Sequence, residues 1–188
     1  MKKYLLSGIT LFAICASFAL LLSIVNMLTA PTIKRNAEKR IADSLSVVNF
    51  EDAVVDMEFG EQKVEDDTVN SYYRLNTEDG VVKGYILNLT GKGYGGKFTL
   101  IASYASDGTL YMAKLLDNSE TSGMGKKYED DSNIAIFSAY PSIPTTKGSL
   151  SAEHSSIVSG ASVTFQGIGV ALQTGQKFVV EVLNGGNP

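Results

Sequence analysis

The sequence has very little cysteine or histidine and lacks tryptophan. Among its 188 residues, Cys15 is the single cysteine and His154 is the single histidine. One cysteine excludes an internal disulfide, and it excludes a zinc or iron–sulfur site that needs several thiolates from this chain. A metal site built on several histidines is excluded in the same way, so we expect no metal centre.

The chain also lacks a large excess of charge of either sign. It carries 16 Lys or Arg and 20 Asp or Glu, a net charge of -4. Nucleic-acid binding needs clustered positive charge, so we expect no nucleic-acid partner. Hydrophobic residues make up 44% of the chain and charged residues 19%, a composition that predicts a folded protein rather than a disordered one.

A long uncharged stretch lies near the N-terminus. No charged residue occurs between Lys3 and Lys34, and most residues between them are apolar. A membrane-spanning helix needs about 20 such residues. The alternative, a cleaved signal peptide, has a shorter apolar region and a small-residue cleavage site, which Leu28-Thr29-Ala30 does not match. We therefore expect residues 1–33 to form an uncleaved transmembrane anchor.

The charges are sorted along the chain. Residues 34–40 carry four positive charges and one negative charge, whereas residues 41–188 carry 10 Lys or Arg against 19 Asp or Glu. The basic segment follows the span directly, where it can contact lipid headgroups. The positive-inside rule leaves the orientation of the span open. Lys2 and Lys3 precede the span and four basic residues follow it, and a long domain after the span weakens the rule. We expect a single-pass protein of the inner (cytoplasmic) membrane whose C-terminal domain is extracytoplasmic.

The remainder divides into a short helix and one domain. We expect a juxtamembrane helix over residues 34–49, continuing from the anchor and started by Pro31, and a domain over residues 50–188. The domain alternates turn residues with β-rich runs. The predicted fold class is α+β: a single N-terminal transmembrane helix followed by an antiparallel sheet with helices.

Two Asp-Gly pairs carry the sheet prediction. Asp79-Gly80 and Asp107-Gly108 each lie between runs of β-forming residues, which is a hairpin signal. Near the C-terminus, residues 162–172 have helical spacing of apolar residues. Residues 178–183 either extend that helix or form a last strand.

A glycine-rich stretch at residues 91–96 matches the pattern GxGxxG, and with Lys97 it nearly matches a P-loop. Both nucleotide-binding motifs need a strand before the glycines and a helix after them. Here residues 97–101 are typical of a strand, and Phe98 stands where a P-loop has Ser or Thr. We reject both motifs and expect a glycine-rich loop between two strands.

The segment Ser-Gly-Ala-Ser-Val-Thr at residues 159–164 is a small-residue turn that opens a helix. Ser162 is a candidate N-cap. The N-terminus of a helix favours an anion, and Thr164 places a hydroxyl in the first turn. The residues alone leave two interpretations open: a phosphate esterified to Thr164, and a simple helix cap.

Three segments resemble motifs of the FMN-binding domain family. Residues 159–164 resemble its flavinylation motif, (Ser/Thr)-Gly-Ala-(Ser/Thr)-x-(Ser/Thr). Residues 120–125 resemble its Glu-Thr-Pro-Gly-(Leu/Met)-Gly loop, with Ser122 in place of proline, and residues 93–96 resemble its Gly-Tyr-x-Gly loop. The three occur in the family order. Residues 20–33 also resemble the anchor of one subfamily, the G subunit of the Rnf complex, an ion-translocating ferredoxin:NAD oxidoreductase.

The resemblance implies a covalent cofactor. In that family the last residue of the flavinylation motif carries FMN through a phosphoester, which a flavin transferase installs with FAD as donor. The matching residue here is Thr164. Residues expected to contact FMN are Ser159, Gly160, Ala161, Ser162, Val163, Glu120, Thr121, Ser122, Gly123, Met124, Gly125, Lys127, Tyr94 and Gly95. Tyr94 either walls the flavin or packs on the sheet. Lys126 or Lys127 either balances the charge of the phosphate or of a reduced, anionic flavin, or is a solvated surface residue.

The resemblance further implies an electron-transfer subunit of a Na⁺- or H⁺-translocating complex, with other membrane and iron–sulfur subunits as partners and no complete active site on this chain. Two alternatives keep the flavin: a stand-alone membrane-anchored extracellular electron shuttle, and a C subunit-like part of a sodium-pumping NADH:quinone reductase. A further alternative is a non-redox anchored binding module in which residues 159–164 are only a helix cap.

Overall fold

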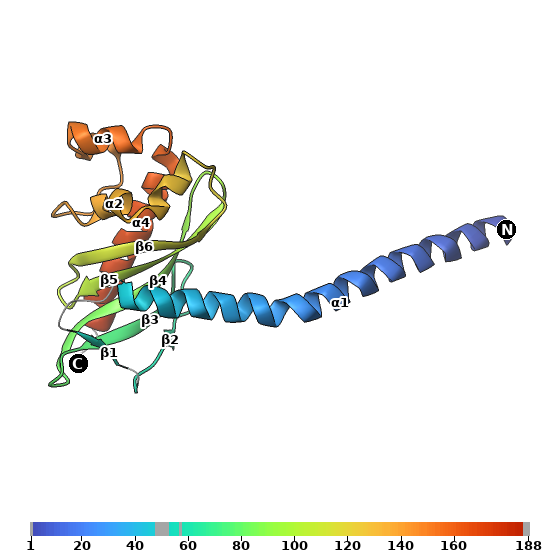
Figure 1. Ribbon diagram of the computed structural model, residues 1–188, viewed down its shortest axis with the longest axis horizontal. Helices are drawn as coiled ribbons and strands as arrows, with labels where there is room; N and C mark the ends of the chain where they lie inside the picture. Colours follow the sequence, from blue (N-terminus) through green and yellow to red (C-terminus); the bar gives the residue numbers. More distant parts are fainter. Residues whose placement is uncertain (1, 48–52, 57, 186–188) are drawn as a thin grey trace. The chain divides into compact units, whose positions relative to one another are not determined.

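The computed structural model describes residues 2–47, 53–56 and 58–185 (Figure 1). The chain divides into two compact units, Met1–Arg40 and Ile41–Pro188. The first is helical and the second contains the sheet, and each is described by itself.

The N-terminal helix α1 (Lys2–Val47) contains Pro31 within it. The expected helix beyond residue 33 does continue from the anchor, but Pro31 lies inside α1 and not at a helix start. A proline at an interior position removes one backbone hydrogen bond and its ring crowds the carbonyl four residues earlier. Residues 48 and 49 of the expected juxtamembrane helix lie outside the described residues. Within α1, Leu11–Thr32 has a mean hydropathy of 2.4 and is long and apolar enough to cross a membrane.

The sheet is antiparallel and six-stranded, which confirms the predicted fold class. Its main strands follow the order β3-β4-β5-β6, and two short strands, β1 and β2, both pair with β3. The strands are β1 (Val54–Val55), β2 (Gln62–Lys63), β3 (Val69–Asn76), β4 (Val82–Lys92), β5 (Lys97–Ala105) and β6 (Leu110–Asn118).

Both predicted Asp-Gly hairpins are confirmed, between β3 and β4 and between β5 and β6. Gly80 has φ 80° and Gly108 has φ 86°, values that favour glycine. At the second turn, the Asp107 carboxylate accepts a hydrogen bond from the Thr109 N–H at 2.8 Å. The glycine-rich loop joins β4 to β5, also as predicted, and no helix follows it directly.

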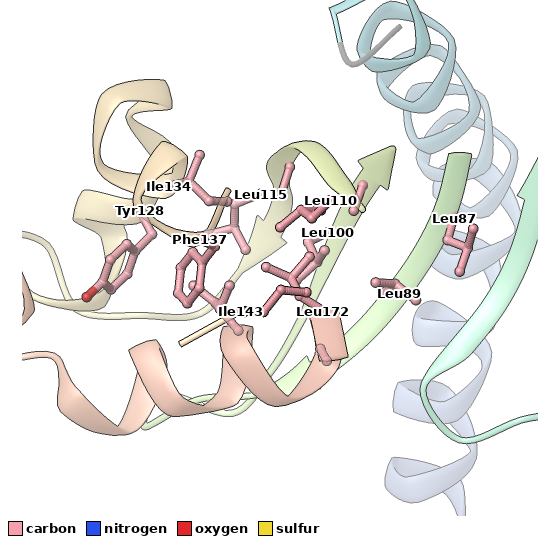
Figure 2. Packing of buried hydrophobic residues seen from close by; sticks show 14 of the residues in the cluster. Leu87, Leu89, Leu100, Leu110, Leu115, Tyr128, Ile134, Phe137, Ile143 and Leu172 are labelled. Carbon is pink, nitrogen blue, oxygen red and sulfur yellow. The ribbon is translucent and has the colours of Figure 1, made fainter. Parts of the chain in front are cut away.

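The larger hydrophobic core lies between one face of the sheet, the helix α4 (Ser162–Lys177) and the short helices after β6 (Figure 2). Leu89, Leu100 and Leu172 in this core are all 0% exposed. Burying each such side chain contributes about 1.5–3 kcal/mol. Strand residues alternate between faces, so Ile86 belongs to a second, smaller core with Ile101.

Glycines let α4 approach the rest of the domain closely. A Cβ at Gly167 would collide with the carbonyl oxygen of Lys92, and one at Gly169 would collide with the carbonyl oxygen of Pro144. The Tyr104 hydroxyl, which is fully buried, donates to the Leu172 carbonyl oxygen at 2.9 Å. The start of α4 is therefore fixed against the end of β4.

Short helices fill the chain between β6 and α4. They are η1 (Gly125–Glu129), α2 (Asp131–Ile134), η2 (Ala135–Phe137), η3 (Lys147–Ser149) and α3 (Ala152–Val158). Tyr128 of η1 packs near Phe165 of α4, with ring centroids 6.2 Å apart, and Phe137 stacks on Phe165 at 4.7 Å. Residues 178–183 continue α4 as a π-helix, η4 (Phe178–Leu183), so the helical alternative was right.

Candidate functional site

Three loops that are distant in sequence meet at the N-terminus of α4. They are residues 93–96 between β4 and β5, residues 120–125 after β6, and residues 159–161 before α4. Together they border a cavity of about 230 Å³. Its lining residues are Tyr94, Glu120, Thr121, Met124, Gly125, Gly160, Ala161, Ser162, Val163 and Thr164.

Thr164 lies in the first turn of α4 and is only 1% exposed. Its hydroxyl donates a hydrogen bond to Oε2 of Glu120 at 2.8 Å. Thr174 of the same helix behaves differently, because its hydroxyl donates to the backbone carbonyl of Val170 one turn earlier, at 3.0 Å. The hydroxyl of Thr164 is thus directed to a carboxylate 44 residues away in the sequence.

Ser162 is not the N-cap, which corrects the sequence prediction. Ala161 occupies that position with φ −136° and ψ 30°, and no side-chain hydrogen bond caps this helix. The chain turns earlier than expected because Gly160 has φ 80° and the Ala161 N–H donates to the Val158 carbonyl oxygen at 3.0 Å. The first N–H groups of α4 therefore begin the helix without a side-chain acceptor.

The carboxylate of Glu120 links the loop of residues 93–96 to the first turn of α4. Glu120 is 5% exposed, its Oε1 accepts from the Gly95 N–H at 3.0 Å, and its Oε2 accepts from Thr164. Its own N–H donates to Oδ1 of Asn118 at 3.0 Å. A buried carboxylate needs such donors, because removing it from water is costly.

Glycines enclose this carboxylate. A Cβ at Gly93 would collide with Oε1 of Glu120, and a Cβ at Gly125 would collide with Oε2. The glycines of two motifs thus leave room for the side chain of Glu120. This packing fixes where its carboxylate lies relative to Thr164.

Two lysines reach the turn before α4. Nζ of Lys127 donates to the Ser159 carbonyl oxygen at 2.7 Å, and Nζ of Lys147 donates to the Ser159 hydroxyl oxygen at 3.2 Å. Partial burial lowers the pKa of Lys127. The two lysines and the N-terminus of α4 give this end of the site a positive potential, beside the negative charge of Glu120.

The remaining predicted residues lie at the edge of the site. Tyr94 is 79% exposed, so it does not pack on the sheet. Thr121 and Met124 line the cavity and are exposed, and the Met124 N–H donates to the Thr121 carbonyl oxygen at 3.1 Å. The lining does not include Gly95, Ser122, Gly123, Lys127 or Ser159.

A larger groove of about 610 Å³ shares one lining residue, Val163, with this cavity. Lys92, Lys97 and Asp67 line it together with residues of α4. The sequence prediction missed this groove and the roles of Lys147 and Asn118, because nothing in their sequence spacing places them near residues 159–164. Among the described residues, no group of three or more His, Cys, Asp or Glu side chains is placed to hold a metal ion.

The comparisons with known proteins agree with this geometry. Residues 93–176 match the family model of the FMN-binding domain, and they include all three loops. Two proteins from two strains of Cereibacter sphaeroides, each named as the G subunit of an ion-translocating oxidoreductase complex, are 42% identical to the chain over the matched residues. One match covers 53 residues and the other 50, or 28% and 27% of this chain.

These two matches span 24% and 23% of the length of the relatives, about a quarter of each. The family match and both relatives nonetheless point to the same kind of protein. Residues 93–176 are similar to the FMN-binding domain family, and the chain is similar over part of its length to the G subunits of ion-translocating oxidoreductase complexes.

Proposed function

We propose that this chain is the membrane-anchored electron-transfer subunit of an ion-translocating oxidoreductase complex and that it carries FMN covalently on Thr164. The observation that supports this most strongly is the position of the Thr164 hydroxyl. It lies where three family motifs meet, inside the segment that matches the FMN-binding domain.

The site fits a phosphoester. The phosphate would lie at the uncapped N-terminus of α4, with Lys127 and Lys147 close to the same turn, and both features favour an anion. A cavity of about 230 Å³ is smaller than the roughly 300–1,000 Å³ of pockets that enclose a whole ligand. We infer that the cavity holds the phosphate and the adjoining chain, while the flavin ring extends past Tyr94 and Met124.

The chain's own residues bind and orient the cofactor rather than supply acid–base chemistry for electron transfer. Bound FMN exchanges electrons in steps of one or two. Thr164 would fix one end of the cofactor, the two lysines would offset its negative charge, and the exposed side chains of Tyr94, Met124 and Val163 would shield the ring from water.

The membrane part of the proposal rests on α1. Leu11–Thr32 contains no charged residue, and two of its hydroxyls donate inside the helix: Ser17 to Ala13 O and Thr29 to Val25 O, both at 2.8 Å. We propose a single pass through the cytoplasmic membrane, with residues 50–188 on the extracytoplasmic side. Because this span has no charged side chain that could form an ion path, we propose that partner subunits form the path for the translocated ion.

The test uses the full chain produced in cells that contain a flavin transferase. We expect flavin absorbance to remain with the purified protein after acid precipitation, and to be reversibly bleached by a chemical reductant before precipitation. Thr164→Val, which keeps the shape but removes the hydroxyl, should lose the retained flavin, and Thr164→Ser should keep it. A wild-type protein that retains no flavin would contradict the covalent attachment and favour a non-redox, membrane-anchored binding module.

Membership in a complex needs a separate measurement. We expect iron–sulfur and multi-span membrane subunits to co-purify with the wild-type chain under mild detergent. A flavin-loaded chain that purifies alone would favour the stand-alone electron shuttle.

A further inference from the structure

We propose that Glu120 is the proton acceptor for the Thr164 hydroxyl when the flavin phosphoester forms. This inference rests on the proposed attachment of FMN to Thr164. On this proposal the group that removes the hydroxyl proton belongs to this chain, which is the protein substrate, and not to the transferase alone.

The first argument is the direction of the Thr164 hydroxyl. Thr29 and Thr174 donate to a carbonyl one turn earlier in their helices, the bond that threonine commonly makes there. Thr164 instead donates to Oε2 of Glu120 at 2.8 Å. The proton therefore lies between the two oxygens, and the lone pairs of Oγ1 are directed away from the carboxylate.

The second argument is that the carboxylate is held in place before any reaction. Oε1 of Glu120 accepts from the Gly95 N–H, and its backbone N–H is held by Asn118. The backbone at Gly93 and Gly125 packs so closely against the carboxylate oxygens that a Cβ at either position would collide with them. With Oε1 already occupied, Oε2 is the oxygen committed to Thr164, and a base fixed in this way needs no reorganisation to act.

The third argument is location. Glu120 and Thr164 both line the cavity of about 230 Å³, so the hydroxyl-bearing residue and its hydrogen-bond acceptor border the same open space, which a phosphoryl donor would enter. The positive potential from the α4 N-terminus, Lys127 and Lys147 lies at the same end. This potential favours the negatively charged phosphates of a dinucleotide.

The step balances with a flavin adenine dinucleotide as donor. Oγ1 of Thr164 attacks the phosphorus on the flavin side, forming the Oγ1–P bond. The P–O bond to the second phosphate breaks, and AMP leaves with the bonding electron pair. The hydroxyl proton moves to Oε2 of Glu120 and is later released to solvent. No oxidation or reduction occurs.

The decisive experiment measures the rate at which the purified full-length protein gains the flavin adduct, with purified flavin transferase and FAD, by intact-protein mass. Glu120→Gln keeps the size of the side chain and can still accept from the Gly95 N–H, but its amide cannot take the proton. We expect kcat for adduct formation to fall about 10²-fold, the low end of the effect of a positioned base, while KM for the protein substrate stays within twofold.

Glu153→Gln is the matched control. It makes the same chemical change at an exposed acid of α3, close in sequence to residues 159–164, and should leave both kcat and KM unchanged. The thermal unfolding midpoint of each variant is measured beside the rates. A purely structural role for Glu120 predicts that the rate loss is recovered at temperatures where the variant is folded.

If Glu120→Gln does not fold, Glu120→Asp decides the question. The shorter side chain retains a carboxylate but cannot reach both Gly95 and Thr164, so we expect an intermediate loss of kcat, about tenfold. An unchanged or faster rate in either variant would overturn the role of Glu120. If the wild-type protein itself gains no adduct, the attachment to Thr164 fails instead, so the two failures are distinguishable.

Discussion

The helix α1 and the sheet domain place similar side chains in opposite surroundings. In the span Leu11–Thr32, Phe12 is 75% exposed and Leu22 is 69% exposed, whereas Leu100 and Leu172 of the domain are 0% exposed. The apolar side chains of the domain have protein partners. Those of the span are exposed on α1, and the length and hydropathy of the span are those of a helix that can cross a membrane. The comparison shows that burial of apolar side chains in a protein core stabilises the sheet domain, whereas the apolar side chains of α1 are suited to a lipid environment.

The largest predicted effect comes from placing charge in the span. Leu20→Arg with Leu21→Arg should move the protein out of the membrane fraction, because each arginine near the centre of a span costs about 2.5–3.5 kcal/mol. Alkaline extraction of membranes measures this. The control is Val54→Arg with Val182→Arg, at exposed apolar sites of the domain, which should stay in the membrane fraction. Equal behaviour of the two pairs would remove the distinction between the units.

The same truncation in the two units should give unequal results. Leu172→Ala should lower the unfolding free energy of the domain by about 2–5 kcal/mol, since it leaves a cavity in the core. Leu22→Ala should leave the domain's unfolding unchanged, because this side chain belongs to the other unit and is exposed on α1. Thermal unfolding of the full chain in detergent measures both. A domain that tolerates Leu172→Ala as well as Leu22→Ala would contradict the described core.

A smaller pair of changes concerns glycine. Gly169→Ala should destabilise the domain by roughly 1–3 kcal/mol, because the new Cβ would collide with the carbonyl oxygen of Pro144. Gly8→Ala in α1 meets no atom within 4 Å and should not change the domain's unfolding midpoint. The midpoints of the two variants are compared in the same detergent. A neutral Gly169→Ala would show that α4 lies farther from Pro144.

The smallest predicted effect is a pH dependence of the stability of the sheet domain, which the span does not share. The Phe59 N–H and the Arg74 guanidinium, 2.5 Å away, hold the pKa of the Asp56 carboxyl below its ordinary value. A lowered folded-state pKa stabilises the domain above the unfolded pKa of about 3.9, and this contribution disappears as the pH falls through the folded value.

Asp56→Asn should therefore be less stable than wild type at neutral pH, and the gap should close at strongly acidic pH. Urea unfolding at several pH values measures it. The span Leu11–Thr32 has no Asp, Glu, Lys or Arg and contributes no such term. A gap that stays constant with pH would contradict the Asp56–Arg74 interaction.

Much of the fold was predictable because its signals are local. An Asp-Gly pair is by itself a turn signal, because only two residues set the conformation of the turn. The length of the uncharged run is by itself enough to predict the apolar span. The strands β1 and β2 were not predicted, since two residues each carry no alternation. Pro31 misled the prediction because proline favours the first turn of a helix, whereas here it lies inside α1.

The site divides in the same way. The three loops were recognisable from their motifs, but motifs do not show which side chains meet. The hydrogen bond between Glu120 and Thr164 joins residues 44 positions apart and depends on how α4 packs on the sheet. The N-cap was misplaced at Ser162 because serine has the stronger capping preference, whereas the conformation of Gly160 placed the helix start at Ala161.

The central claim is that FMN is attached to Thr164, and peptide mass spectrometry tests it most directly. Lys147 and Lys177 flank a segment without other Lys or Arg, so trypsin releases residues 148–177 as one peptide that contains Ser159, Ser162 and Thr164. From protein made with the flavin transferase, we predict that this peptide gains the mass of FMN less one water and that fragmentation places the gain on Thr164. An unmodified peptide, or a gain on either serine, would contradict the account.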